Sequence, residues 1–206
     1  KNLLKENYSD AGLDCADVVV ALGGDGFMLQ TLHLVCTRGV PVYGMNKGTV
    51  GFLMNKFSKT GLTDRIRLAK EEVVYPLKMI ATKSDESKEE GLAINEISLL
   101  RSGPQAANLK ISVDGSLRLK ELVCDGALVC TPAGSTAYNY SAHGPILPIG
   151  ANILALTAMS AYRPRRWRGA LLPMDAQIDI EIIDFTKRPV SAVADGVEVK
   201  NVKKVS

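Results

Sequence analysis

The stretch that decides the fold of the first part of the chain is VVVALGGDGFMLQTLH, residues 18–33. Its first five residues form a continuous apolar run, which is typical of a strand buried on both faces of a parallel sheet. Two glycines, an aspartate and a third glycine follow. The sequence after them predicts an amphipathic helix that begins near Phe27 and closes at Gly39. Strand, glycine turn and helix in this order predict an α/β unit.

The chain as a whole is predicted to form two domains of different class. VPVYGMN (40–46) and KTGLTDRIRLAKEE (59–72) predict a second strand and a second helix. They complete a small α/β domain of Rossmann-like or flavodoxin-like type over residues 1–72. Residues 73–206 instead show strand-length segments in which apolar and polar residues alternate. We expect this second domain to be a mainly antiparallel β-sandwich.

Turn signals and apolar patterns predict the strands of the second domain. The Asp-Gly pairs at 114–115 and 195–196 each separate two alternating segments, which predicts two β-hairpins. LAINEISLLR (92–101) and LVCDGALVC (122–130) are each interpreted as one further strand. KSDESKEEG (83–91) is interpreted as a charged loop.

Bulk composition excludes several classes of protein. Of the 206 residues, 46% are hydrophobic, which is enough for a sizeable core. The net charge of +3, from 25 basic and 22 acidic residues, does not indicate a nucleic-acid partner. The arginine-rich stretch YRPRRWRG (162–169) is therefore interpreted as a solvated or subunit-contact loop.

No apolar run approaches the roughly 20 residues of a membrane-spanning helix, so we expect no membrane contact. The chain begins at Lys1 rather than Met and ends at Ser206 in charged, strand-like sequence, so we expect both ends to be incomplete.

The cysteines and histidines do not form a metal-binding pattern. The cysteines contain no C-x-x-C pair, and we interpret them as reduced core thiols of a cytoplasmic protein rather than as disulfides or metal ligands. They are Cys15, Cys36, Cys124 and Cys130. The two histidines, His33 and His143, are too few and too distant in sequence to suggest a zinc cluster.

The glycine turn is predicted to bind phosphate. Gly23, Gly24 and Gly26 permit a close approach of the backbone to a ligand. The helix that follows presents free N–H groups and the positive end of its dipole, which suits an anion. The turn matches neither the G-x-x-x-x-G-K-[ST] loop nor the G-x-G-x-x-G fingerprint of dinucleotide-binding domains.

Asp25, inside this turn, has two interpretations. It lies at the start of the predicted helix, and aspartate is among the best N-cap residues. A carboxylate beside a phosphate site is otherwise repulsive, unless a metal ion bridges them or the carboxylate accepts a proton from an attacking hydroxyl, as in phosphoryl transfer. The two roles are compatible, and the turn alone does not choose between them.

Four segments together resemble the bacterial NAD kinase family. GGDG at a strand-to-helix turn also occurs in diacylglycerol-type kinases and, in similar form, in phosphofructokinases. Three further segments resemble NAD kinase signatures in the same order and at similar spacing: GMNKGTVGFL (44–53), NEISLLR (95–101) and DGALVCTPAGSTAYNYSAHGPILP (125–148). The alternatives are a GGDG-type kinase for a lipid or sugar, which leaves the last two segments unexplained, and a non-catalytic nucleotide-binding protein, which has no need of Asp25.

The resemblance implies an enzyme that transfers the γ-phosphoryl group of ATP to the 2′-hydroxyl of the adenosine ribose of NAD, giving NADP. Asp25 is then the general base for that hydroxyl, and Gly23, Gly24 and Gly26 lie against phosphates. Mg²⁺ delivered with ATP is the implied divalent cation, because no carboxylate cluster in the sequence suggests a separate site for it. The family also tends to form dimers or tetramers, so a homodimer or homotetramer is implied.

The resemblance further implies which residues contact NAD. Phe52 borders the adenine, the Asn95-Glu96 pair hydrogen-bonds the adenine and the ribose hydroxyls, and Asp125 binds the nicotinamide end across a subunit boundary. The small polar run that follows position 132 holds the adenine and the ribose. The residues implied in NAD binding are Gly26, Phe52, Asn95, Glu96, Asp125, Thr136, Ala137, Tyr138, Asn139, Tyr140 and Ser141.

Each of these positions also has a purely structural interpretation. Phe52 is alternatively a core aromatic, Glu96 a solvent-facing residue of an edge strand, and Asp125 a plain turn aspartate. Two positions depart from the family pattern. Leu53 stands where many members have a second aromatic residue, and Val123 stands where members often have an arginine.

Overall fold

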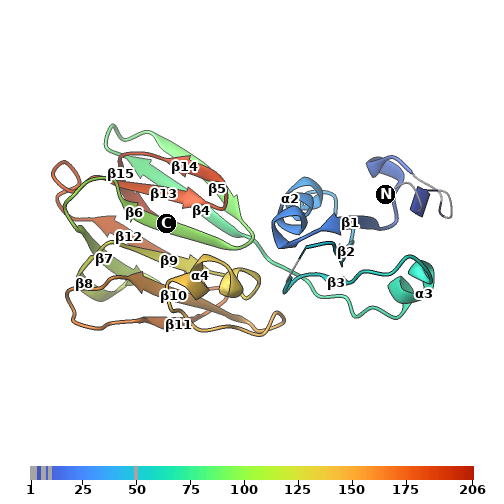
Figure 1. Cartoon of the computed structure of the whole chain (residues 1–206). Helices are drawn as coiled ribbons and strands as arrows, with labels where there is room; N and C mark the ends of the chain where they lie inside the picture. Colours follow the sequence, from blue (N-terminus) through green and yellow to red (C-terminus); the bar gives the residue numbers. More distant parts are fainter. Residues whose placement is uncertain (1–3, 6–7, 9–10, 49–50) are drawn as a thin grey trace. The chain divides into compact units, whose positions relative to one another are not determined.

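The computed structural model of the chain describes residues 4, 5, 8, 11–48 and 51–206. Its contacts form two compact units, Lys1–Val73 and Val74–Ser206, which we call the N-terminal and the C-terminal unit (Figure 1). The N-terminal unit is a small α/β structure and the C-terminal unit consists mainly of antiparallel strands, so the predicted fold class is confirmed. None of the helices in the described part of the chain is long and apolar enough to cross a membrane.

The N-terminal unit is built on a three-stranded parallel sheet with the strand order β1-β2-β3. β1 (Val19–Gly23) pairs with β2 (Val42–Asn46), and β2 pairs with the short β3 (Asn55–Lys56). Parallel neighbours need a crossover connection, and helix α2 (Asp25–Val35) supplies it between β1 and β2. The predicted order of strand, glycine turn, helix and strand is therefore confirmed.

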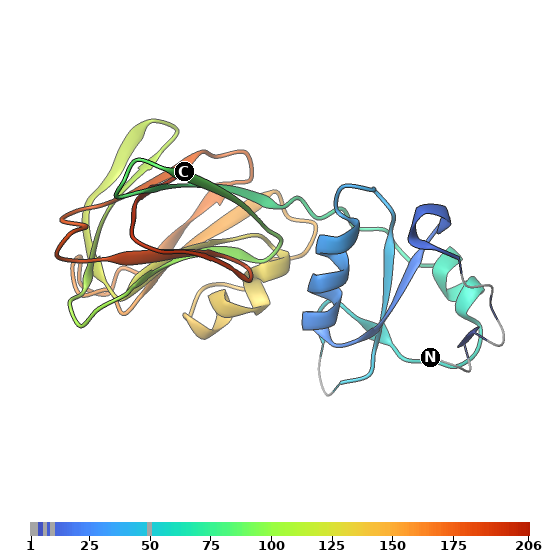
Figure 2. The same ribbon diagram turned by 90° about the horizontal axis from the view of Figure 1, so that it is seen from above.

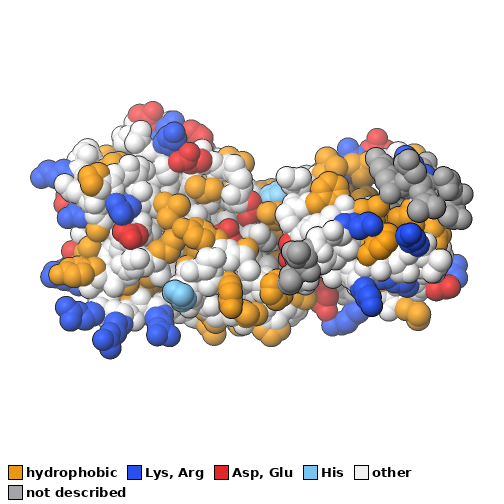
Figure 3. Space-filling model, in the orientation of Figure 1, with side chains coloured by type: hydrophobic (Ala, Val, Ile, Leu, Met, Phe, Trp, Pro, Cys, Tyr) orange, Lys and Arg blue, Asp and Glu red, His pale blue; other side chains and the backbone are white. Residues whose placement is uncertain are grey.

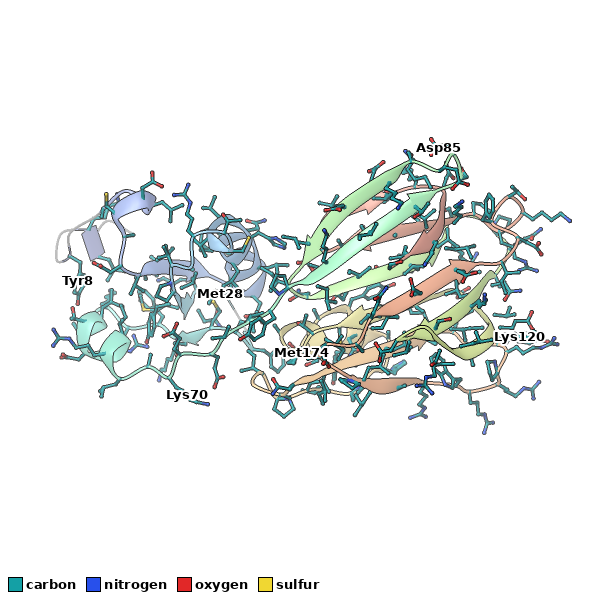
Figure 4. The ribbon with its side chains drawn as sticks, turned by 180° about the vertical axis from the view of Figure 1, so that it is seen from behind. Tyr8, Met28, Lys70, Asp85, Lys120 and Met174 are labelled. Carbon is teal, nitrogen blue, oxygen red and sulfur yellow. The ribbon has the colours of Figure 1, made fainter. Side chains whose placement is uncertain are left out.

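Packing of α2 on the sheet explains its sequence. Met28, Thr31 and Val35 recur every three or four residues and are the buried positions of the helix. A Cβ at Gly44 of β2 would lie 2.4 Å from the Met28 Cε, so glycine allows helix and strand to approach here (Figure 4). A short 3-10 helix, η1 (Leu13–Cys15), precedes β1.

Helices α2 and α3 differ in length from their predictions. α2 begins at Asp25, before the predicted start, and ends at Val35, before the predicted closing glycine. The second helix, α3, covers only Leu62–Arg67 of the predicted 59–72. Gly61, immediately before α3, has a left-handed φ of 66°, which stops the helix from extending toward the N-terminus.

The C-terminal unit is a sandwich of two six-stranded sheets (Figures 1 and 2). Sheet I has the order β11-β10-β9-β6-β13-β14, and sheet II has the order β5-β4-β15-β12-β7-β8. The strands of sheet I are β6 (Glu96–Arg101), β9 (Gly126–Cys130), β10 (Ile153–Met159), β11 (Gly169–Pro173), β13 (Val190–Ala194) and β14 (Val197–Val199). The strands of sheet II are β4 (Leu77–Lys83), β5 (Lys88–Ala93), β7 (Ala107–Val113), β8 (Ser116–Cys124), β12 (Ile178–Ile182) and β15 (Val202–Val205).

Alternating side chains from both sheets form the main hydrophobic core. Leu109 and Ile180 of sheet II and Leu99 of sheet I belong to one buried cluster. β9 is buried on both faces, because its intervening residues, such as Leu128, pack in a second cluster with Leu147. This double burial explains why β9 is continuously apolar rather than alternating.

The two predicted Asp-Gly hairpins are confirmed. Asp114 and Gly115 connect β7 to β8 with φ angles of 50° and 72°, and Asp195 with a φ of 48° lies between β13 and β14. The prediction of a loop over residues 83–91 is confirmed only for residues 84–87, because β4 ends at Lys83 and β5 begins at Lys88 and pairs with β4. β5 is an edge strand, and charged side chains on an edge strand look like a loop in the sequence.

Two segments predicted as single strands each contribute to both sheets. The segment 92–101 passes from β5 of sheet II to β6 of sheet I through a bend at Ile94 and Asn95. The segment 122–130 passes from β8 of sheet II to β9 of sheet I through a bend at Asp125. Apolar patterning does not reveal such a crossing, because the strands before and after it face the same core.

Candidate functional site

The glycine turn joins the carboxyl end of β1 to the start of α2. Gly24 is the N-cap residue, with an extended backbone (φ −110°, ψ −172°). A Cβ at Gly23 would lie 2.7 Å from the Phe27 Cβ, so internal packing requires glycine there. A Cβ added at Gly24 or at Gly26 would meet open space. Apart from chain neighbours and the helix backbone, no described atom lies within 4 Å of it. The open space at these two glycines allows a ligand to approach the helix N-terminus closely.

The Asp25 carboxylate holds the segment after β2 and does not cap α2. Asp25 is the first helical residue, one position after the N-cap. Its Oδ2 accepts a hydrogen bond from the Phe52 N–H at 2.8 Å, and its Oδ1 accepts one from the Leu53 N–H at 3.1 Å. The N-cap interpretation of Asp25 is therefore wrong. Because a carboxylate oxygen has two acceptor positions, both oxygens can accept a further hydrogen.

The segment that Asp25 holds presents an aromatic ring at the surface. A Cβ at Gly51 would lie 2.8 Å from the Asp25 Oδ1, so glycine lets the chain pass close to the carboxylate. Phe52 is 63% exposed, and the interpretation of this residue as a core aromatic is therefore wrong. Residues 49 and 50 of the GMNKGTVGFL segment lie outside the described residues.

In the C-terminal unit, Asn95 and Glu96 carry two buried oxygens that no described residue satisfies. Asn95 lies in the bend between the sheets and Glu96 is the first residue of β6. Because β6 is an inner strand of sheet I, the edge-strand interpretation of Glu96 is wrong. Within the described ranges, the Asn95 Oδ1 and the Glu96 Oε2 have no hydrogen-bond partner. Each such acceptor costs about 1–3 kcal/mol, a cost that a ligand with suitable donors removes.

Asp195, predicted only as a hairpin residue, shapes this bend. Its Oδ2 accepts a hydrogen bond from the Ile94 N–H at 2.7 Å. Its Oδ1 accepts hydrogen bonds from the N–H groups of Asn95 at 3.1 Å and Glu96 at 3.2 Å. The Asp195 N–H in turn donates to the Glu96 carbonyl at 3.2 Å. The sequence carries no sign of these contacts, because they join segments that are about a hundred positions apart.

The surroundings of Glu96 make its carboxyl a weaker acid than that of an exposed glutamate. Burial, as the main cause, and the nearby charge of Asp195 raise the pKa of the Glu96 carboxyl from 4.5 to about 7. A hydrogen bond from the Tyr138 backbone N–H acts in the opposite direction and lowers this pKa. Near neutral pH, Glu96 therefore exchanges readily between the acid and the carboxylate.

We predict that a Glu96→Gln variant gains stability relative to the wild type as the pH rises. The folded protein holds the Glu96 proton more tightly than the unfolded chain, so the wild-type carboxyl costs stability increasingly between pH 4.5 and about 7. The difference in unfolding free energy should reach at most about 3 kcal/mol in favour of the variant above pH 7.

Chemical denaturation of both proteins at pH 5 and pH 8 measures this difference. A Glu198→Gln variant on the exposed edge strand β14 reports what the loss of one surface charge does by itself. An unfolding free-energy difference between Glu96→Gln and wild type that is the same at both pH values would contradict the prediction.

The segment after β9 packs directly on the Asn95 bend. The Thr131 Oγ1 donates to the Ile94 carbonyl at 2.6 Å, and the Thr131 N–H donates to the Asn95 carbonyl at 2.9 Å. A Cβ at Gly134 would lie 2.2 Å from the Asn95 carbonyl oxygen, so the two backbones touch at glycine. The structure thus joins the Asn-Glu pair and the GSTAY run, and we call this group the nucleotide cluster. It comprises residues 94–96, 131–141 and Asp195.

The polar run of the nucleotide cluster forms two short helical turns, η2 (Ala133–Thr136) and α4 (Tyr138–Ser141). The side chains of Tyr138 and Tyr140 are 36% and 60% exposed. Most of the residues predicted in this run are thus accessible to a ligand. The half-buried or exposed ones are Thr136, Ala137, Tyr138, Tyr140 and Ser141.

Asn139 is the exception in this run, because it is fully buried. Its Nδ2 donates to the carbonyl groups of Ser135 at 3.2 Å and Pro145 at 2.8 Å. Its Oδ1 accepts a hydrogen bond from the Thr157 hydroxyl at 2.6 Å. The side chain is engaged in holding the segment together, so we do not include Asn139 in the contacts proposed below.

Asp125 lies far from the nucleotide cluster within one chain. Glu96 begins β6, whereas Asp125 lies beside Arg101 at the end of that strand, so roughly 16 Å of strand separates the two acidic residues. The Asp125 Oδ1 accepts a hydrogen bond from the Arg101 Nε at 2.6 Å, forming an ion pair. Arg101 thus supplies a positive charge beside Asp125. Val123, which stands where family members often have an arginine, supplies none.

The cysteines are all free thiols, but only two of them are core residues. Burial raises the pKa of Cys124 and of Cys130 to about 12 each, which keeps these thiols protonated and unreactive. Cys15 and Cys36 are exposed, so the prediction of four core thiols is wrong for these two. In the part of the chain that the structure describes, no three His, Cys, Asp or Glu side chains are placed to hold a metal ion.

The arginine-rich segment 162–169 is a surface loop between β10 and β11. Arg163 forms an isolated β-bridge with Val123, and Trp167 packs partly against the main core. Basic side chains gather where β8 and β11 lie, at the lower left of Figure 3, and Lys120 of β8 projects from the same end in Figure 4. The arginine side chains of the loop are exposed, and we assign no role to them.

Comparison with known proteins decides the family. Residues 94–205 match the model of the ATP-NAD kinase C-terminal domain, and residues 9–63 match that of the ATP-NAD kinase N-terminal domain. The chain is also 61% identical over 204 residues to an NAD kinase from Cereibacter sphaeroides, covering 99% of this chain and 80% of that protein. The chain belongs to the NAD kinase family. The resemblance drawn from four segments of the sequence is confirmed, and so is the prediction of an enzyme.

Further relatives of the family agree with this assignment. An NAD kinase from Caulobacter vibrioides is 57% identical over 202 residues, covering 98% of this chain and 78% of that protein. Among solved structures, an Archaeoglobus fulgidus NAD kinase in complex with ATP has a TM-score of 0.75 and 26% identity, with 99% of this chain and 82% of that chain covered. Yeast NADH kinase complexed with NADH has a TM-score of 0.77 and 28% identity, with 92% of this chain and 57% of that chain covered.

Proposed function

We propose that the chain transfers the γ-phosphoryl group of ATP to the 2′-hydroxyl of the adenosine ribose of NAD, giving NADP and ADP. Family membership supports the two substrates, and the two solved relatives hold ATP and NADH. The observation that carries the proposal is the pair of buried, unsatisfied oxygens on Asn95 and Glu96. They are acceptors suited to the hydroxyl groups of ribose and the amino group of adenine.

Asp25 is the proposed general base. The 2′-hydroxyl oxygen bonds to the γ-phosphorus, the bond between that phosphorus and the bridging oxygen breaks, and the hydroxyl proton moves to the Asp25 carboxylate. Hydrogen bonds from the N–H groups of Phe52 and Leu53 fix the orientation of this carboxylate and leave it able to accept. Mg²⁺ carried on the phosphates of ATP supplies neutralisation of the developing charge when it is bound.

Gly24 and Gly26 are proposed to contact the phosphate groups of ATP through their backbone. The N–H groups of Asp25 and Gly26 lie in the first turn of α2, where the helix itself offers them no acceptor, whereas those of Phe27 and Met28 donate to the Gly24 carbonyl. The open space above both glycines lets phosphate oxygens approach these first N–H groups. Gly23 contributes indirectly, because its lack of a side chain lets the Phe27 side chain pack against the turn.

We predict that Gly26→Ala weakens ATP binding without destabilising the protein. Apart from its chain neighbours and the helix backbone, the added methyl group has no described atom within 4 Å. Alanine inside a helix also stabilises the helix by about 0.5–1 kcal/mol relative to glycine. The KM for ATP should rise on the order of tenfold, because the methyl group occupies space through which a phosphate approaches the helix N-terminus. Gly12→Ala, which also enters open space in this unit, is the matched control. An unchanged KM for ATP would remove Gly26 from the phosphate site.

The nucleotide cluster is proposed to bind the adenosine part of NAD. Asn95 and Glu96 are proposed to accept hydrogen bonds from it, and Tyr138, whose side chain is 36% exposed, presents its ring or hydroxyl. Phe52 is proposed to border the adenine, and its high exposure supports a ring available for stacking. The remaining proposed contacts are the accessible residues Thr136, Ala137, Tyr140 and Ser141.

Asp125 is proposed to bind the nicotinamide end of an NAD molecule held mainly by a second copy of the chain. Its separation from Glu96 along β6 supports this arrangement, because one chain does not bring the two residues together. We therefore propose a homodimer or homotetramer that works in the cytoplasm, where its four free thiols remain reduced.

The test of the proposed function is a direct assay. The purified chain is incubated with NAD, ATP and Mg²⁺, and NADP is detected with an NADP-specific dehydrogenase. We expect NADP formation that depends on both nucleotides and on the metal ion. Folded protein that forms no NADP under these conditions would overturn the proposal.

A further inference from the structure

The two Asp-Gly hairpins of the C-terminal unit use their aspartates differently. Both aspartates have a positive φ, 50° at Asp114 and 48° at Asp195, as their turns require. The exposed Asp114 accepts one hydrogen bond through its side chain, from the Gln177 N–H at 2.9 Å. The Asp195 carboxylate accepts hydrogen bonds from three consecutive N–H groups of the bend, those of Ile94, Asn95 and Glu96. Turn chemistry alone explains the first aspartate but not the second.

We propose that Asp195 is a positioning residue for NAD, whose carboxylate fixes the bend that directs the Asn95 and Glu96 side chains toward the nucleotide. The inference rests on the proposed function of these two residues. Three consecutive N–H groups converge on one carboxylate, so the bend cannot rotate without breaking several charge-assisted hydrogen bonds. The Asp195 N–H also holds the Glu96 carbonyl, so contacts on both sides of Glu96 fix its backbone.

Asp195 also acts on Glu96 through its charge. The groups that face the Glu96 carboxyl are the Asp195 carboxylate from the β13–β14 hairpin, the Tyr138 N–H from α4 and the Cys130 thiol from β9. Of these, Asp195 carries the negative charge that raises the Glu96 pKa, after the larger contribution of burial. A neutral side chain at position 195 therefore lowers that pKa while keeping nearly the same shape.

The Asp195→Asn variant tests both effects in the full chain. The asparagine oxygen can still accept, but its NH₂ group faces an N–H group of the bend, so the bend loosens. We expect the KM for NAD to rise about tenfold with kcat changed less than about threefold, as for a lost positioning contact rather than a lost catalytic group. Since the pKa of Glu96 is about 7, kcat/KM for NAD in the wild type should show an inflection near that pH, and we expect the variant to move it to lower pH.

Two further variants separate these effects from general damage. Asp114→Asn removes the same charge from the other hairpin and should leave the KM for NAD and its pH profile as in the wild type. In a Glu96→Gln background, Asp195→Asn should no longer move the pH profile, because the group whose ionisation it affects is absent. A pH shift that persists without Glu96, or a KM for NAD equal to that of Asp114→Asn, overturns the inference.

Amide hydrogen exchange tests the contact without turnover, first in the wild-type chain and then in the variant. The N–H groups of Ile94, Asn95 and Glu96 should exchange slowly, and Asp195→Asn should accelerate these three more than the rest of β6. Rapid exchange in the wild type overturns the inference even if the variant does not fold. Slow exchange together with absent NADP formation would instead reject the proposed function and leave the role of Asp195 in the bend intact.

Discussion

Replacing Asp25 with asparagine is expected to leave a folded protein that binds ATP and NAD and has lost kcat by about 10²–10⁴-fold. The asparagine side chain has the same shape, and its oxygen can still accept one of the hydrogen bonds from Phe52 and Leu53. It cannot accept the proton of the 2′-hydroxyl. The loss should therefore appear in the chemical step, with the KM values for both nucleotides changed much less.

The second function of Asp25, holding the Phe52 segment, requires a separate readout. Loss of one hydrogen bond to a carboxylate should lower the unfolding free energy by about 1–3 kcal/mol. Denaturation and steady-state kinetics on the same samples distinguish the two functions. Asp64→Asn, which removes the same charge from the exposed first turn of α3, is the matched control. If Asp25→Asn retains kcat within a few fold while stability falls, Asp25 only holds the segment.

Replacing Gly134 with alanine is expected to lower the unfolding free energy by about 2–4 kcal/mol and to weaken NAD binding. The new Cβ would lie 2.2 Å from the Asn95 carbonyl oxygen and 2.6 Å from the Asn95 Cα. These are backbone atoms in the middle of the bend, so no rotation of a side chain relieves the contact. The segment after β9 must move away from Asn95, and the hydrogen bonds of Thr131 to this bend weaken with it.

Thermal or chemical denaturation and calorimetric titration with NAD measure the two effects of Gly134→Ala. Gly103→Ala in the same unit is the control, because its Cβ would meet only the Pro189 side chain at 4.0 Å, an ordinary van der Waals contact. Wild-type stability in Gly134→Ala would show that the two backbones can separate at little cost. The nucleotide cluster would then not depend on their close packing.

Local patterns predicted much of the fold because they arise from neighbouring residues. The apolar run before Gly23 predicted β1, and the glycine turn predicted that a helix follows, since both depend on burial and backbone freedom within a few positions. The hairpins at Asp114 and Asp195 were predictable for the same reason. The family resemblance pointed to Asn95, which the structure shows with an unsatisfied buried oxygen.

Apolar patterning did not predict the places where the chain crosses from one sheet to the other. In the segment 92–101, apolar residues lie on both sides of the polar pair Asn95-Glu96, so its overall pattern resembles that of one strand. The crossing depends on which sheet lies on each side of the core, and that arrangement involves strands throughout the C-terminal unit. The interpretation of Glu96 as an edge residue was wrong for this reason, since sheet order is not encoded locally.

By itself, the sequence determined the α/β and antiparallel β classes, the two hairpins and the family, because period, turn chemistry and clustered signatures are local properties. Only the tertiary structure decided what three polar side chains do. Asp25 holds the Phe52 segment instead of capping its helix, Asn139 is engaged in internal hydrogen bonds, and Asp195 fixes the bend before β6. Each of these roles depends on hydrogen-bond partners that the folding of distant or intervening segments brings within about 3 Å. No pattern of neighbouring residues specifies such a partner.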